Sequence, residues 1–519
     1  MTGKAWYATF PTTHNIGYLQ QPLNCIQEVQ MMNQLLQSMQ SYDTRTENNA
    51  ITHSSSGNAA TDFFFQVGAL RGQPENKIIT SFQRAFGESP LDTLRILFYA
   101  RDIRLGQGER RTFRTILSNL ARNVQTESIV ERNLACIPYF GRWDDLFVLF
   151  GTRLEKPALD LIQRALRSED RLCAKWMPRE KSSQKAFATK IQTHMDLTPR
   201  TYRKLLSSLT QVVESQMCAD DWERVRYSAV PSVAMKNYRK AFEKHSPERW
   251  KEFLENVKSG VEKVNAGALY PHDLIRPMLS DPYACTSVLS ADEKDLLDSQ
   301  WKALPNYLKD NSERIMPVVD TSGSMYSQFS SDSKLMPIMV SVSLGLYIAE
   351  RNEGPFQDHF VTFSQTPSLQ KVVGKDLASR VECMRNADWG YNTDLQKVFS
   401  LILKSAVRDN ISENDMPSMI LIISDMEFDN AVTGAVESTN MDAIRHKYSQ
   451  AGYQLPKVVF WNVNAKSDNN PVKFDESGTA LVSGFSPSIM TQILEGSEIT
   501  PISMMRRVID QERYSCVVL

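Results

Sequence analysis

The spacing of hydrophobic residues divides this chain into a helical half and a half in which strands and helices alternate. From residue 61 to about residue 304, apolar residues recur at offsets of three and four, as in 90–100 and 112–120. Strand-like runs are scarce there, and polar breaks separate the helical blocks. We therefore predict a HEAT-like α-solenoid without a strict sequence repeat.

After residue 306 the pattern changes to short apolar runs that alternate with helix-sized blocks. This alternation is typical of a doubly wound, Rossmann-like parallel sheet, so the expected fold class is α + α/β. The predicted strands are 315–320, 359–363, 419–424 and 457–463, and the predicted helices are 334–351, 393–408, 439–451 and 486–495.

The same pattern predicts how the chain is divided. Residues 41–60 are rich in Ser, Thr, Asn and Gly and lack periodic apolar positions, which indicates an extended arm. The expected segments are an N-terminal segment with the arm (1–60), a helical-repeat domain (61–305), an α/β domain (306–500) and a C-terminal helix or tail (501–519).

Composition narrows the class of protein without identifying a ligand. The 519 residues are 42% hydrophobic and 23% charged, as in ordinary soluble globular proteins. A net charge of −1 creates no global attraction for nucleic acid or a membrane surface. The seven cysteines show no paired spacing, which argues against zinc and a disulfide framework and favours a reducing, cytoplasmic location. We see no signal peptide and expect no transmembrane helix.

The first candidate site follows the strand predicted at 315–320. Asp320 ends this strand, and Ser322 and Ser324 follow it at spacings of two and four. Open α/β sheets place their ligand sites at the carboxyl ends of the strands. Hard oxygen donors on such a loop suit a divalent cation, with Mg²⁺ expected first and Mn²⁺ or Ca²⁺ as alternatives.

Two further loops can supply the remaining oxygen ligands. Asp425 ends the buried run 420–424 in the same way, and the loop 389–394 offers the hydroxyl of Thr393. Because Mg²⁺ takes about six oxygens, one loop alone would not complete its coordination. The alternative is that Asp320 and Asp425 only cap the helices that follow.

These three loops, in this order, resemble those of the von Willebrand factor A domain and its metal-ion-dependent adhesion site. In that family a carboxylate of a partner typically completes the metal. Asp394 and Glu427 lie nearby, but the pattern gives them no direct role. The resemblance implies the metal-binding set Asp320, Ser322, Ser324, Thr393 and Asp425.

The same residues argue against an enzyme. A phosphatase of the aspartyl-phosphate type would need an acid two residues after Asp320, where Ser322 stands. Ser324 lacks a Gly-x-Ser-x-Gly elbow and a nearby histidine to activate it. A metal-dependent hydrolase is therefore the weakest of the functional hypotheses.

Two basic stretches mark the helical half. Residues 101–114 are dense in arginine, and residues 164–204 carry eleven Lys or Arg against four acids. Such residues beside aromatic rings could hold a phosphate backbone, or they could be solvated faces and internal pairs such as Arg110 with Asp144 or Asp145. The candidate RNA-binding residues are Arg101, Arg104, Arg110, Arg111, Arg114, Arg142, Lys175, Arg179, Lys181 and Lys185.

A helical-repeat domain followed by a von Willebrand A domain resembles the architecture of the Ro (TROVE-domain) ribonucleoproteins. It resembles more closely the DUF2828 family, which joins TROVE-like helices to such a domain. The resemblance implies structured non-coding RNA as the ligand; the alternative is a metal-dependent protein scaffold that does not bind RNA. The strings that carry it are 46–50, 56–58, 101–104, 108–110, 141–146 and 175–178.

The last four residues, Cys516-Val517-Val518-Leu519, match the pattern for prenylation. A lipid on Cys516 would anchor the protein peripherally to a membrane. The alternative is an ordinary apolar tail that packs on the domain or extends away from it.

Overall fold

We describe the chain from a computed structural model that places residues 44–210, 212–279, 289–329, 335–363, 367–387, 393–429, 439–495 and 499–519. Most of the predicted N-terminal segment and part of the loop 389–394 lie outside these residues.

A six-stranded sheet forms the centre of the α/β domain, with the strand order β5-β4-β3-β6-β7-β8. All neighbouring strands are parallel except β5, which runs antiparallel to β4. The four predicted strands are present to within one residue, whereas β5 and β8 were not predicted. The bounds are β3 (Ile315–Val319), β4 (His359–Thr362), β5 (Leu369–Lys371), β6 (Met419–Ser424), β7 (Lys457–Asn462) and β8 (Thr479–Ser483).

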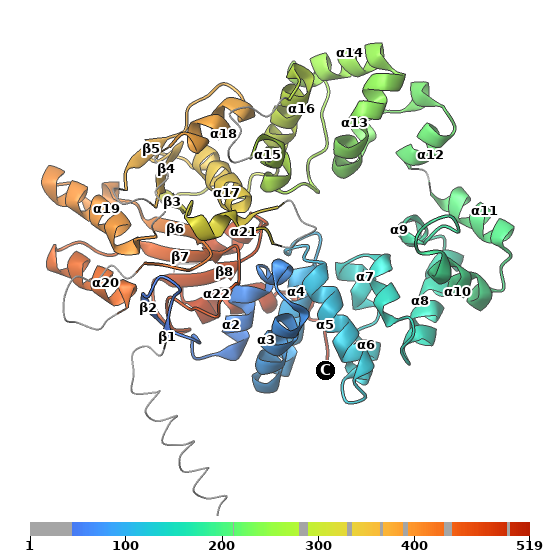
Figure 1. Ribbon diagram of the computed structural model, residues 1–519, viewed down its shortest axis with the longest axis horizontal. Helices are drawn as coiled ribbons and strands as arrows, with labels where there is room; N and C mark the ends of the chain where they lie inside the picture. The colour runs from blue at the N-terminus through green and yellow to red at the C-terminus, as the bar shows by residue number, and fades with distance from the viewer. Residues whose placement is uncertain are drawn as a thin grey trace, which may run out of the picture.

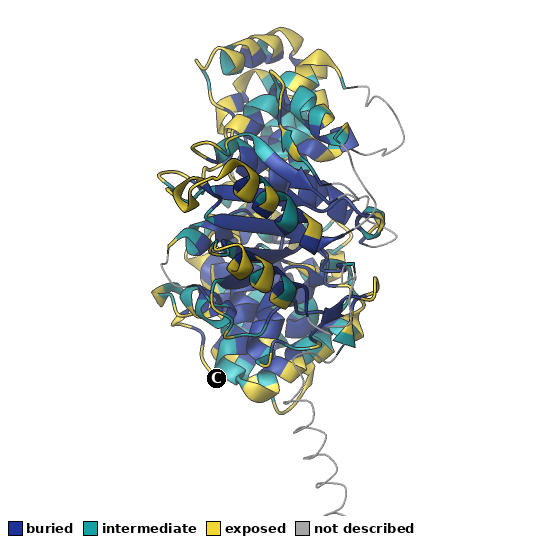
Figure 2. Cartoon of the chain, turned by 90° about the vertical axis from the view of Figure 1, so that its left-hand side faces the viewer, coloured by how far each residue is buried: buried dark blue, intermediate teal, exposed yellow. Residues whose placement is uncertain are grey.

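Both faces of the sheet are covered, which explains why its strands are apolar without alternation. In β3, Met316 and Val318 enter one hydrophobic cluster, and Ile315 and Val319 enter another. Figure 2 shows the strands buried between helices. The helices of this domain are α17 (Pro337–Arg351), α18 (Leu377–Arg385), α19 (Leu395–Asp409), α20 (Asn440–Gln450), α21 (Ile489–Leu494) and α22 (Pro501–Ile509), with 3₁₀ turns η5 (Gly323–Tyr326), η6 (Glu413–Asp415) and η7 (Glu512–Tyr514).

The predicted helical half is helical in the structure, after a short hairpin of β1 (Thr44–Arg45) and β2 (Ile51–Thr52). Its first part consists of α2 (Ala59–Val67), η1 (Leu70–Gly72), α3 (Glu75–Glu88), α4 (Pro90–Arg101), α5 (Arg111–Arg122), α6 (Glu127–Arg132), α7 (Cys136–Phe140), η2 (Trp143–Leu149), α8 (Glu155–Arg167), α9 (Arg171–Trp176), α10 (Lys185–Met195) and α11 (Pro199–Leu209). Its second part consists of α12 (Val213–Cys218), η3 (Trp222–Arg224), η4 (Tyr227–Ala229), α13 (Ser232–His245), α14 (Pro247–Lys258), α15 (Pro271–Leu279) and α16 (Ala291–Lys302).

The helices form an arc that begins and ends on the α/β domain (Figure 1). At its start α2 packs against β8 and α22, and at its end α15 packs against α17 and α18. The indole of Trp301 donates to Glu350 at 2.6 Å, and Arg351 donates to the Trp301 carbonyl at 2.8 Å. The arc is therefore closed by the α/β domain, a point that the hydrophobic pattern could not decide.

Apolar packing joins the two halves. One cluster runs from α2–α11 through α15 to α17, α21 and α22, so the helices share a core with one face of the sheet. A separate cluster holds α12, α13 and α14 together. Among the described residues no helix is both long enough and apolar enough to cross a bilayer.

Candidate metal centre and basic surface

Two acids come together at the carboxyl edge of the sheet because their strands are neighbours. β3 pairs with β6 along its whole length, up to Val319 opposite Ile423. Asp320 and Asp425 each lie just past the end of their strand, and the Asp320 amide donates to the Ile423 carbonyl at 3.0 Å. Parallel strands in register bring both carboxylates to one edge, as predicted.

The loop after β3 arranges its oxygens around Asp320. The Ser322 amide donates to Asp320 Oδ1 at 2.9 Å, and the hydroxyls of Ser322 and Ser324 lie 3.1 Å apart. The hydroxyl of Ser424, at the end of β6, donates to Asp320 Oδ2 at 2.5 Å. These bonds fix the orientation of a carboxylate that is fully buried.

Thr393 reaches the same edge from the start of α19. Its hydroxyl donates to the Glu427 carbonyl at 2.9 Å, and its amide donates to Asp429 Oδ2 at 2.8 Å. Both partners lie on the loop that follows Asp425. Hydrogen bonds thus connect the three loops named from the sequence. Thr393 binds the loop that follows Asp425, and Ser424, at the end of β6, binds Asp320.

Asp320 and Asp425 are buried carboxylates, and their like charges repel each other. Burial raises the pKa of Asp320, and the negative charge of Asp429 adds to this effect. Burial and the charge of Asp320 raise the pKa of Asp425 to about 7. Asp425 is 1% exposed, and its Oδ2 atom has no hydrogen-bond partner among the residues that the structure describes. A bound divalent ion would relieve the repulsion between these like charges.

This donor set differs from a site made of acids, histidines or cysteines. No group of three such side chains suited to a metal occurs among the described residues. The five predicted residues instead offer two carboxylates and three hydroxyls, which are hard ligands that suit Mg²⁺ or Ca²⁺ better than zinc.

Asp394 and Glu427 lie beside the candidate centre but serve other partners. Asp394 caps α19 by accepting the Lys397 amide at 3.0 Å. Glu427 is 1% exposed and accepts from the Asn469 amide at 3.1 and 3.2 Å and from the Ser467 hydroxyl. These contacts agree with a pattern that gave neither acid a direct role.

A segment that the sequence analysis did not assign to the site crosses its edge. We call residues 44–53 the strap. Asn48 donates its side-chain amide to Thr393 Oγ1 at 3.2 Å and to the Glu427 carbonyl at 2.7 Å. The Thr46 hydroxyl and the Glu47 amide bind the same loop, at Phe428 O (2.6 Å) and Glu427 Oε2 (2.7 Å). Residues 46–50 are among the strings that support the family resemblance, but no local motif predicts that they contact the loop after Asp425.

Several arginines predicted to bind RNA form ion pairs within the protein. Arg101 is 1% exposed and binds Asp145 Oδ2 at 2.7 Å, so it cannot reach a phosphate; this prediction is wrong. Arg114 binds Asp145 Oδ1 at 2.6 Å, and Arg110 binds Asp144 at 3.2 Å, as the alternative of internal pairing stated. The start of α5 is therefore held to η2 by ion pairs.

Other candidates also have intramolecular partners. Arg104 donates to the Tyr139 carbonyl at 2.6 Å, and Arg111 donates to the carbonyls of Arg71 and Gln73 at 2.8 and 2.7 Å. The guanidinium of Arg142 lies 4.3 Å from the centre of the Trp176 ring. Arg179 donates to the Thr210 hydroxyl at 3.2 Å. Residues 164–204 are therefore a better candidate for binding RNA than residues 101–114.

We call the free cations of residues 164–204 the basic surface. Each is exposed, and none forms an ion pair with a described residue, whereas Lys190 in the same stretch is paired with Glu155. They lie on α8 to α11 and, for Lys181, on the turn between α9 and α10, and they include three of the predicted residues. The members are Arg164, Arg167, Arg171, Lys175, Lys181, Lys185, Arg200, Arg203 and Lys204.

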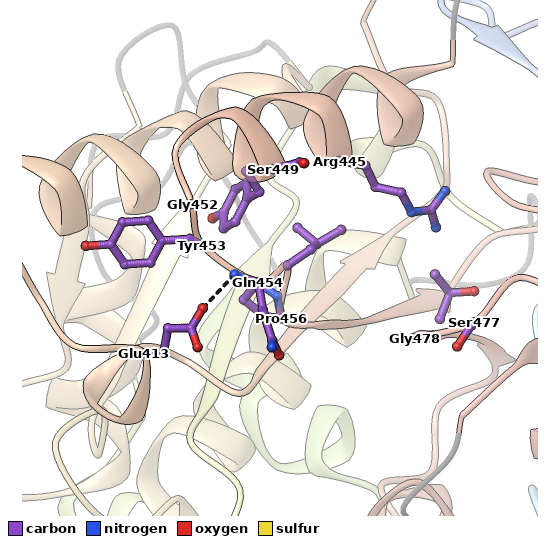
Figure 3. Close-up of a pocket in the computed structure, with 12 residues that line it drawn as sticks. Glu413, Arg445, Ser449, Gly452, Tyr453, Gln454, Pro456, Ser477 and Gly478 are labelled. Carbon is purple, nitrogen blue, oxygen red and sulfur yellow. Dashed lines mark hydrogen bonds between the residues drawn. The ribbon is translucent and has the colours of Figure 1, made fainter.

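A cavity of about 460 Å³ lies at the opposite edge of the sheet (Figure 3). Pro456 and Gly478, which line it, come just before β7 and β8, so it opens at the amino ends of the strands. Glu413 and Arg445 provide charges of both signs. Its position separates this cavity from the candidate metal centre.

The comparisons with known proteins divide the chain at the same place as the fold. A family model named DUF2828, a domain of unknown function, matches residues 46–126 and 161–313. The predicted resemblance to DUF2828 is supported. A second model, DUF7788, also a domain of unknown function, matches residues 314–514, which form the α/β domain. The uncharacterized protein L728 of Acanthamoeba polyphaga mimivirus is 29% identical over 516 residues, covering 90% of this chain and 87% of that protein.

Proposed function

We propose that this DUF2828-like chain is a non-enzymatic, Ro-like RNA-binding protein whose α/β domain holds a divalent cation for ligand recognition. The observation that carries the metal part is the buried pair Asp320 and Asp425, in which Asp425 Oδ2 has no hydrogen-bond partner from the described part of the chain. A cation would offset the effects of burial and of neighbouring negative charge that raise both pKa values.

The residues present fit a hard divalent cation. Asp320, Ser322, Ser324, Thr393 and Asp425 would hold it, and Mg²⁺ is the expected ion. By the resemblance to von Willebrand A domains, an acidic group of a ligand would complete its coordination. When bound, the cation would supply positive charge at a surface whose own side chains are acidic.

Metal binding is tested by titrating Mn²⁺ into EDTA-treated protein and following the bound ion by electron paramagnetic resonance. We expect one site per chain, with Mg²⁺ competing for it. Zn²⁺ should not compete selectively, because hydroxyl ligands do not favour it. A protein that binds no Mn²⁺ at millimolar concentration would contradict the proposal.

Asn48 should support this site from the strap. We expect Asn48→Ala to weaken Mn²⁺ binding about 10-fold, since partners that orient a metal ligand typically contribute that much. The physical reason is loss of the hydrogen bond to Thr393 Oγ1. Asn256→Ala is the control, because that amide binds Glu262 near the end of α14. If both variants bound Mn²⁺ with equal affinity, the strap would have no role in metal binding.

RNA binding rests on a different observation, the basic surface. Nine exposed cations that pair with none of the described acids lie on adjacent helices and one connecting turn, and they give local positive charge in a chain of net charge −1. Phosphate contacts release counterions, so the affinity for structured RNA should fall steeply as salt is raised.

The triple variant Lys175→Glu, Lys181→Glu, Lys185→Glu should lose at least about 10-fold in affinity for a structured RNA and show a shallower salt dependence. Its control reverses three exposed lysines elsewhere: Lys309, Lys375 and Lys404. Both variants have the same net charge, so a filter-binding assay separates a local surface from a general effect. Equal losses in the two variants would count against the basic surface.

The alternative is a metal-dependent protein scaffold without RNA binding. The grouping of Asp320, Asp425 and Thr393 at one edge of the sheet favours it, because a partner carboxylate could complete the coordination of an ion held there. Pull-downs with Mg²⁺ and with EDTA distinguish the two functions. A scaffold should lose its partners in EDTA, whereas RNA bound to the helical arc should remain.

A further inference from the structure

We propose that Cys136 and Cys516 are a reversible thiol–disulfide pair that fastens the C-terminal tail, residues 510–519, to α7. Their Sγ atoms lie 3.6 Å apart, although the residues are 380 positions apart in sequence. A disulfide needs a sulfur–sulfur distance of about 2.05 Å. Forming the bridge therefore requires the two sulfurs to approach each other by roughly 1.5 Å. The inference does not depend on the metal or on RNA.

The tail is anchored on the N-terminal side of Cys516. Arg513 binds both carboxylate oxygens of Asp102, at 2.5 and 2.9 Å, and the Tyr514 hydroxyl donates to the same carboxylate at 3.2 Å. The Tyr514 ring stacks on Phe140 with 5.3 Å between ring centres. These contacts bring the tail against the end of α7, the helix that carries Cys136.

The tail is anchored on the other side of Cys516 as well. The Val518 amide donates to Asn133 Oδ1 at 2.9 Å, and Asn133 donates its side-chain amide to the Val518 carbonyl at 2.5 Å. Val517 is 1% exposed. Cys516 is thus held next to Cys136 from both directions, which gives the two thiols a high effective concentration.

Small oxidants can reach the pair. A surface cavity of about 590 Å³ is lined by both cysteines, together with Tyr139 and Arg513. Cys516 is exposed, whereas burial and the neighbouring Cys516 raise the pKa of Cys136 to about 12. Cys516 is therefore the thiol that reacts first, and Cys136 is the resolving thiol.

Glutathione disulfide, a small-molecule disulfide oxidant, would close the bridge in two balanced steps. The Cys516 thiolate attacks one sulfur of the oxidant, the oxidant's S–S bond breaks, and one glutathione leaves and takes up a proton. Cys136 then releases its proton to solvent and attacks Cys516 Sγ, which expels the second glutathione. Two protein thiols are oxidised and one glutathione disulfide is reduced to two thiols.

The bridge would have two consequences. It would convert a tail held by packing and hydrogen bonds into one joined covalently to the helical arc. It would also exclude prenylation of Cys516, because one sulfur cannot form both bonds. In the structure the tail packs on the domain, with Tyr514 and Val517 buried.

The test equilibrates the full chain in buffers of increasing glutathione disulfide to glutathione ratio. Free thiols are then labelled with N-ethylmaleimide, and unreduced peptides are analysed by mass spectrometry. We expect Cys136 and Cys516 to lose their labels together in one transition and a linked peptide to appear. Cys218, which is exposed and has no sulfur neighbour among the described residues, should stay labelled or carry glutathione alone.

Variants separate a pair from two independent thiols. Cys136→Ser should leave Cys516 as a stable glutathione adduct, and Cys516→Ser should leave Cys136 labelled at every ratio. Cys218→Ser, the control, should preserve the linked peptide. A wild-type chain that carries glutathione on Cys516 while Cys136 remains labelled would overturn the proposal, and so would failure of the linked peptide to form at the most oxidising ratio.

Discussion

Replacing Asp425 by asparagine is expected to stabilise the metal-free protein and to abolish its response to Mg²⁺. The substitution removes one of two buried like charges and keeps the shape of the side chain. A pKa shift of one unit corresponds to about 1.4 kcal/mol, so the gain in the free energy of unfolding should be at least about 1 kcal/mol. Mn²⁺ affinity should fall more than about 100-fold, since loss of a ligand costs more than loss of a partner that orients one.

This combination of signs separates a metal ligand from a helix cap. A residue with only a structural role would lower stability when changed and leave the metal response intact. Asp394→Asn is the matched control, because Asp394 caps α19 and asparagine caps as well as aspartate. Thermal unfolding of both variants in EDTA and in Mg²⁺ provides the measurement. If Asp425→Asn destabilises the protein in EDTA and Mg²⁺ still raises its melting temperature, the proposed site is wrong.

The burial of Asp425 and its repulsion by Asp320 also predict how the stability of the protein depends on pH. Folding raises the pKa of Asp425 from 3.8 to about 7, so between these values the folded state binds more protons than the unfolded state. The stability of the metal-free protein should therefore fall as the pH rises from about 4 to about 7. Asp425→Asn should flatten this slope. Metal affinity should rise over the same range, because the proton and the cation compete for the carboxylates.

Replacing Arg101 by methionine is expected to destabilise the helical arc by about 3 kcal/mol, the magnitude found when one partner of a buried ion pair is removed. Asp145 is fully buried, and its Oδ2 atom would lose the guanidinium of Arg101 and keep only the Arg142 amide, while Arg114 held Oδ1. Methionine keeps most of the side-chain volume, so packing changes little. Urea unfolding followed by circular dichroism measures the loss.

Arg167→Met serves as the control for this prediction, because Arg167 is an exposed member of the basic surface without an ion pair. It should change the free energy of unfolding by less than about 0.5 kcal/mol. RNA binding should show the reverse. Arg167→Met should reduce the salt dependence of the RNA affinity, whereas folded Arg101→Met should leave it unchanged. A stable Arg101→Met protein with weakened RNA binding would restore the original prediction for Arg101.

The sequence was sufficient for features that depend on local pattern. Continuous apolar runs predicted β3, β4, β6 and β7 because both faces of the sheet are covered. The acids that end β3 and β6 could be placed at one edge because neighbouring parallel strands share a direction. β5 was missed because an antiparallel edge strand of three residues has no buried periodicity. β8, although buried, is a run of five residues that lies outside the predicted alternation.

Only the tertiary structure decided which charged and polar groups meet across long separations. Arg101 and Arg167 are alike as residues, yet one binds a buried acid from η2 and the other faces solvent. Asn48 lies 345 positions from Thr393, and Cys136 lies 380 positions from Cys516, so no local spacing could reveal either contact. Periodicity records which face of an element is buried, whereas the partner of a side chain depends on how the elements pack. The closure of the helical arc on the α/β domain is what brings these partners together.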